Sequence, residues 1–230
     1  MPRTVAILAA LAGMLLAGTP FAAGIGKGPP LLAGPPALPP SYTAPPYAAR
    51  PYVSPQATAA EAADLAFMRE EEKLARDVYL RLHDAWGIAP FASIAASEQH
   101  HMDAVLRLLT RYRVADPAAG NAVGEFSDAG LQALFDALVV RGTASAAAAL
   151  RVGALVEEVD LDDLAGALAR TDKRDVDQVY ESLACGSRNH LRAFAGALAV
   201  LTGQPYAAQH LPQAAVDAIL ASPVGECSAR

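Results

Sequence analysis

The chain of 230 residues has little of what marks most functional classes. Aromatic residues make up 6%, there are two cysteines and one tryptophan, and no glycine-rich phosphate loop follows a strand-like segment. The net charge of −6 argues against nucleic acid as the main partner, because phosphate binding needs a basic surface. No stretch shows the alternation typical of a run of strands, and alanine and leucine dominate. This composition predicts an all-α fold.

Long apolar runs are also scarce, and the clearest lies at the start of the chain. Residues 5–17 are apolar, Arg3 precedes them, and small residues follow at positions 22–24. This arrangement predicts a secretory signal peptide over residues 1–24, and a mature protein that is periplasmic or secreted and makes no membrane contact after cleavage. A retained single-pass anchor is the alternative, although the run is short for a span. The cysteines, Cys185 and Cys227, suit an oxidising compartment and are expected as either a disulfide or two free thiols.

The rest of the chain divides by proline content and helical periodicity. Residues 25–56 contain four Pro-Pro pairs, which predicts an extended linker. The folded domain is expected over residues 57–212, and residues 213–230 form a tail with one short helix at 213–220. Glycine and proline positions delimit the predicted helices, which are 58–86, 91–113, 128–141, 144–170 and 173–203. A short link, a long crossover with the short helix 128–141, and a second short link indicate two helical hairpins joined into a four-helix bundle.

The first two long helices carry acidic and imidazole groups on their apolar faces. An α-helix turns about 100° per residue, so the direction of each side chain follows from its position. In the first helix Glu71 falls in the middle of the apolar arc and Glu72 on its edge, while Glu70 points away and is expected to meet water. In the second helix Glu98 and His101 are three residues apart and share the buried face.

The third and fourth long helices repeat this pattern with one change. Glu157 interrupts an apolar stripe of the third helix, with Glu158 to one side and Asp160 to the other. Ser187 and His190 lie within the apolar stripe of the fourth helix. Each long helix therefore places at least one polar group in the bundle interior.

Three ionised carboxylates in an apolar interior repel one another, and each has a desolvation cost of several kcal/mol. A divalent cation offsets both effects. We therefore predict a metal site with Glu71, Glu98 and Glu157 as oxygen ligands and His101 and His190 as nitrogen ligands. Carboxylate and imidazole ligands together suit iron, in a mono- or dinuclear site, and also manganese or zinc.

The segments that hold these residues resemble a bacterial ferritin-like domain family of unknown function. They are MREEEKLARDVY at 68–79, SEQHHM at 97–102, GALVEEVD at 153–160 and GSRNHLRAF at 186–194. The resemblance covers residues 58–212 and implies a ferritin-like four-helix bundle. Ferritin-like proteins use two Glu and two Glu-x-x-His motifs around two irons. Here Ser187 stands where the last Glu is expected, so the site has one carboxylate fewer unless Asp160 substitutes for it, and Glu158 is the alternative to Glu157.

Two functions follow as hypotheses. The first is an exported metal-binding bundle with ferrous-oxidase or peroxide-related redox activity, in which metal ions are the main partners. The second is a metal-free bundle that serves as a structural or interaction module of the cell envelope. A second apolar face on the third long helix, at Val152, Val156 and Val159, leaves a homodimer open, although the crossover helix is the preferred cover.

Overall fold

The structure is a computed structural model, and it describes residues 56–225. Six helices and no strand form in this part of the chain, which confirms the all-α prediction. They are α1 (Ala59–Trp86), α2 (Ala89–Tyr112), α3 (Ala129–Gly142), α4 (Ala146–Leu168), α5 (Arg174–Thr202) and α6 (Gln213–Ala221). Among the described residues, no helix is both long and apolar enough to cross a membrane. The predicted signal peptide, nearly all of the linker, and Cys227 lie outside the described residues.

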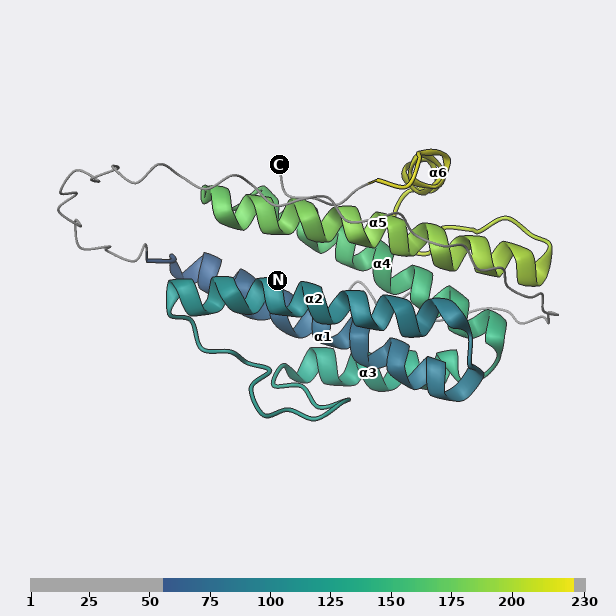
Figure 1. Cartoon of the computed structure of the whole chain (residues 1–230), viewed down its shortest axis with the longest axis horizontal. Coiled ribbons are helices and arrows are strands. Elements are labelled where there is room, and N and C mark those ends of the chain that lie inside the picture. Colours follow the sequence, from purple (N-terminus) through teal and green to yellow (C-terminus); the bar gives the residue numbers. More distant parts are fainter. Residues whose placement is uncertain (1–55, 226–230) are drawn as a thin grey trace, which may run out of the picture.

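The four long helices form two hairpins that lie against each other (Figure 1). α1 and α2 make one hairpin, and α4 and α5 make the other. α3 lies against α1 and α4, and α6 lies against α5. The crossover from α2 to α4 therefore places its helix on the flank of the bundle, between the two hairpins.

Local sequence explains where the helices begin and end. The Thr58 side chain accepts a hydrogen bond from the Glu61 amide, and the Glu61 carboxylate accepts one from the Thr58 amide, which is a capping box. Gly87 and Gly203 end α1 and α5 with φ of 62° and 70°, a left-handed conformation that glycine adopts without strain. The side chains of Asp128 and Ser145 cap α3 and α4 in the same way as Thr58 caps α1.

The apolar core is divided into two clusters along the bundle axis. One cluster contains Leu65, Met68, Val105, Leu164 and Leu183 together with their neighbours. The other lies on the opposite side of the polar positions, and its buried members include Leu74, Ile94, Leu150 and Leu191. Between them, every long helix contributes buried polar side chains, so a polar layer crosses the middle of the bundle.

The crossover is fixed to α1 by charged side chains. Glu70 is 3% exposed, and its carboxylate accepts hydrogen bonds from the backbone amides of Ser127 and Asp128 at 2.5 and 3.0 Å. Lys73 donates to the Ala122 carbonyl at 2.7 Å. The expectation that Glu70 meets water is therefore wrong, because the crossover covers the side of α1 that its own periodicity marks as outward.

Candidate metal centre

The first half of the polar layer joins α1 to α2. His101 Nδ1 lies 2.7 Å from Glu98 Oε2 and 3.1 Å from Glu72 Oε2. The three side chains can offer one ligand atom each within 4.8 Å of one another. Glu72 and Glu98 are each 2% exposed, so this group is closed to bulk water on its carboxylate side.

The second half joins α2 to the α4–α5 hairpin through the same Glu98. His190 Nδ1 lies 2.8 Å from Glu98 Oε1 and 3.5 Å from Glu157 Oε2. The other imidazole nitrogen, Nε2, lies 3.0 Å from the Ser97 hydroxyl. A histidine that binds a metal usually has its second nitrogen held by such a partner, which orients the ring.

These distances match the spacing of ligands around one ion. Two atoms that each lie about 2.1 Å from an ion are about 3.0 Å apart at a right angle and about 3.4 Å apart at a tetrahedral angle. The four contacts to the two Nδ1 atoms, between 2.7 and 3.5 Å, cover this range. Moreover, three buried atoms have no hydrogen-bond partner, namely Glu72 Oε1, Glu98 Oε1 and His190 Nδ1. The 2.8 Å contact between His190 Nδ1 and Glu98 Oε1 is therefore not aligned as a hydrogen bond. The residues fit a divalent cation.

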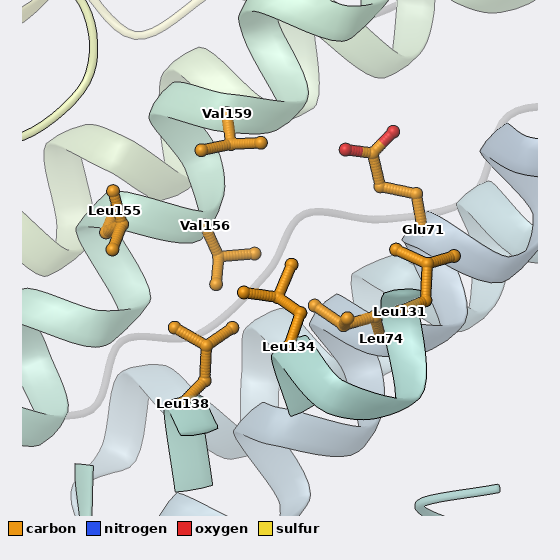
Figure 2. A pocket seen from close by; sticks show the side chains of 8 residues that line it. All are labelled: Glu71, Leu74, Leu131, Leu134, Leu138, Leu155, Val156 and Val159. Carbon is orange, nitrogen blue, oxygen red and sulfur yellow. The ribbon is translucent and has the colours of Figure 1, made fainter. Parts of the chain in front are cut away.

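Glu71 is the one predicted ligand that the structure leaves outside both groups. It points between α3 and α4 into a small cavity of about 20 Å³ that is otherwise lined by aliphatic side chains (Figure 2). Its lining consists of Glu71, Leu74, Leu131, Leu134, Leu138, Leu155, Val156 and Val159. Burial raises the pKa of Glu71 well above its usual value, and the neighbouring carboxyl groups of Asp163 and Asp160 act in the same direction. The same cavity shows α3 covering the second apolar face of α4.

Burial and mutual attraction set the protonation of the layer. Burial raises the pKa of Glu72 to about 7, although the His101 imidazolium opposes the rise. Burial acts in the same direction on Glu98, but the imidazoliums of His190 and His101 hold its pKa well below the ordinary value. Burial opposes the charge of His190, yet Glu98 and Glu157 raise its pKa to about 10. Without a metal, protons on the imidazoles balance part of the carboxylate charge.

Tyr79 supports Glu157 from across the bundle. Its hydroxyl donates a hydrogen bond to Glu157 Oε1 at 2.5 Å, which leaves Oε2 on the side of His190. The Tyr79 ring is fully buried and packs against Phe91 and Phe194, with ring centroids 6.0 and 5.0 Å away. This packing fixes the hydroxyl, and through it the direction of the Glu157 carboxylate.

His101 is the most exposed of the residues in the two groups, and it connects the layer to the surface. With its side chain 12% exposed, it lines a groove between α2 and α5. The basic residues His100, Arg107 and Arg111 lie along the same groove. Gly186 of α5 makes room for the ring, since a Cβ there would stand 2.6 Å from His101 Cε1 and Nε2. The groove therefore reaches the polar layer at His101.

Glu158, next to Glu157, has a different role. It is fully buried, and its carboxylate accepts hydrogen bonds from the Tyr206 hydroxyl and from the backbone amides of Gln209, His210 and Leu211. These donors belong to the segment that follows α5. Glu158 therefore anchors that segment to α4 and is not a candidate ligand.

The ligand set predicted from the sequence omits two contributors to the layer, Glu72 and Tyr79, although the sequence carries a signal for both. A heptad pattern runs along α1 through six residues, each of which is no more than 5% exposed. Its members are Leu65, Met68, Glu72, Ala75, Tyr79 and Leu82. This pattern places Glu72, and not Glu71, on the seam toward the other helices.

The helical domain of this chain is similar to a known protein family and to a protein of known structure. A family model described as an uncharacterized protein domain, DUF2202, matches residues 61–223. The chain belongs to the DUF2202 family. A relative of this DUF2202 chain, the uncharacterized protein MJ0754 from Methanocaldococcus jannaschii, is 44% identical over 162 residues, which is 70% of this chain and 87% of that protein. The crystal structure of the hypothetical protein MJ0754 aligns with a TM-score of 0.72 at 42% identity, and the alignment covers 74% of this chain and 97% of that one.

Proposed function

We propose that the polar layer binds divalent metal ions, with iron as the first candidate and manganese or zinc as the alternatives. Glu72, Glu98 and His101 hold one ion, and Glu98, Glu157 and His190 hold a second, so that Glu98 bridges the two groups. The observation that carries the proposal is the convergence of both Nδ1 atoms on one buried carboxylate, with unpaired carboxylate oxygens around them.

Charge gives the physical reason. Glu72, Glu98 and Glu157 are all buried, and the two histidines neutralise them fully only if further protons are taken up. A divalent ion replaces those protons, and a mixed carboxylate and imidazole set is the ligand chemistry of iron, manganese and zinc. Metal binding therefore competes with protonation of Glu72, whose pKa of about 7 lies in the physiological range.

We further propose that the bundle is of the ferritin-like type and that the protein is exported. Two hairpins joined by a long crossover, with ligands at the middle of all four helices, support the first part. The apolar start of the chain supports the second, and the absence of a free cysteine among the described residues suits an oxidising compartment.

The test is a metal count on the full chain. The protein is stripped with chelator, titrated anaerobically with ferrous, manganous or zinc ions, and analysed for bound metal per chain. We expect tight binding in the wild type and none in Glu98→Ala plus His101→Ala. His100→Ala, which changes an exposed neighbour on the same helix, is the matched control and should bind as the wild type does.

Redox activity is a separate measurement on the same material. Air is admitted to the ferrous-loaded protein, and the rate of ferric formation is compared with that of the double variant. A folded wild type that takes up none of the three ions would remove the proposal and would favour the metal-free structural module. In that case the layer is a proton-balanced network between the hairpins.

A further inference from the structure

Asp160 and Ser187 form a buried pair at the edge of the polar layer. The Ser187 hydroxyl lies 2.5 Å from Asp160 Oδ2 and 2.9 Å from the Leu183 carbonyl. Asp160 follows Glu157 by three residues on α4, and Ser187 precedes His190 by three on α5. Both therefore share the helix faces that hold the second group of ligands.

The surroundings of Asp160 destabilise an ionised carboxylate, because they are buried and contain other acidic groups. It is 5% exposed, and its Oδ1 atom is buried without a hydrogen-bond partner. The acidic groups that act on it electrostatically come from three helices and are Glu72 on α1, Glu98 on α2, and Glu157 on its own helix α4. A fourth, Glu71, is also affected by it. An aspartate among acids, with one oxygen unpaired, calls for a cation close by.

We propose that Asp160 is the fourth carboxylate of the metal centre and that Ser187 is its positioning residue. This inference rests on the proposed function and makes it more specific. α4 then supplies two carboxylates, Glu157 and Asp160, and compensates for the serine at the α5 position three residues before His190. The hydroxyl of Ser187 holds Oδ2, so that Oδ1 is the oxygen left for a metal ion.

With Asp160 included, the charges of the ligands and of two divalent ions balance. Four carboxylates, from Glu72, Glu98, Glu157 and Asp160, carry four negative charges, which two divalent ions cancel while both histidines are neutral ligands. Without Asp160, two ions leave one positive charge in a buried layer. Two bound ions per chain are therefore expected, and the second should depend on Asp160 more than the first.

The experiment is a titration of the full chain with cobaltous ion, followed by both bound metal per chain and the visible absorption of the bound ion. The wild type should bind two ions. Asp160→Asn should bind one, or bind the second at least tenfold more weakly, with a changed absorption spectrum. Asp162→Asn is the matched control, since Asp162 lies on the same helix with its side chain 61% exposed, and it should retain two ions.

A reciprocal variant tests the role of Ser187. Ser187→Glu in the Asp160→Asn background returns a carboxylate to α5 and should restore the second ion. Ser187→Ala leaves Asp160 without its hydrogen bond and should weaken the second ion about tenfold while the first is unchanged. This single variant also serves if Asp160→Asn does not fold, as judged by circular dichroism of the metal-free protein.

The outcomes separate this inference from the function on which it rests. If Glu98→Ala loses both ions but Asp160→Asn and Ser187→Ala keep two with unchanged affinity and spectrum, then Asp160 is not a ligand and the metal centre stands without it. If the wild type binds one ion only, the four-carboxylate centre is refuted. If the wild type binds none, the proposed function and this inference fall together.

Discussion

Glu157 and Glu158 are neighbours on α4, both buried, and should respond in opposite ways to the same substitution. Glu158 accepts hydrogen bonds from four donors, one hydroxyl and three consecutive backbone amides, at distances of 2.5 to 3.1 Å. Glu157 accepts one from Tyr79 and otherwise faces His190. Glu158 therefore stabilises the fold, whereas Glu157 is a ligand of the proposed ion.

The magnitude for Glu158→Gln follows from counting acceptors. The glutamine carbonyl oxygen can keep about two of the four donors, and its amide group turns two N–H bonds toward the remaining backbone N–H groups. A buried donor that loses its partner costs about 1–3 kcal/mol. We therefore expect a loss of about 2–4 kcal/mol in the free energy of unfolding. For a domain of this size that lowers the Tm by about 5–15 °C.

Glu157→Gln removes a charge but keeps an oxygen for the Tyr79 hydroxyl. In the metal-free protein it should change the free energy of unfolding by less than about 1 kcal/mol, because it also relieves repulsion from Glu98. It should, however, lower the bound metal per chain. Urea unfolding of the chelated proteins, followed by circular dichroism, and a metal count on the loaded proteins measure both effects.

Glu158→Gln, by contrast, should keep the metal content of the wild type. A stability loss below about 1 kcal/mol in Glu158→Gln would refute the anchoring role. Equal metal loss in both variants would show that the division between the two neighbouring glutamates is incorrect.

Four further predictions follow. Gly186→Ala should weaken metal binding, measured by titration, because the added Cβ would displace the His101 ring. Gly153→Ala, whose Cβ would stand 2.8 Å from the Phe194 ring, should instead lower the free energy of unfolding in urea by about 1–3 kcal/mol and leave the metal count unchanged. Apparent metal affinity should rise between pH 6 and 8, with protons released to the buffer in calorimetry, because Glu72 has a pKa of about 7 and must lose its proton to bind. Metal at about 100 times its Kd should add about 2.7 kcal/mol per site to stability, and a Tm that does not respond to metal would contradict binding. Glu61→Gln should lower the free energy of unfolding by about 1–2 kcal/mol at pH 7, because burial of Glu61 is outweighed by the Lys173 ion pair and the Thr58 cap, which lower its pKa from 4.5 to about 2. This contribution is present above pH 4.5 and is lost as the pH falls through 2. The unfolding free energies of the variant and the wild type, measured with urea, should therefore converge in acid.

The sequence by itself determined the helices and their ends. Glycine and proline positions, among them Gly87 and Gly203, place the expected boundaries within a few residues of those observed, and the structure adds capping side chains at Thr58, Asp128 and Ser145. These signals are local, because a cap or a glycine acts on the backbone within one turn. Periodicity also placed Glu98, His101, Glu157 and His190 on inward faces, and the structure brings these four together.

Only the tertiary structure decided between neighbouring residues on α1. Every residue from Met68 to Ala75 is buried, since α2, α4, α3 and the crossover surround this part of the helix. When a helix is covered on all sides, hydrophobic periodicity no longer tells which buried face meets which neighbour. Glu70 then binds the crossover, Glu71 lines the cavity between α3 and α4, and Glu72 alone reaches His101. The contact between Asp160 and Ser187 was likewise decided by the packing of α4 on α5, because a helix specifies the direction of a side chain but not the group that it meets.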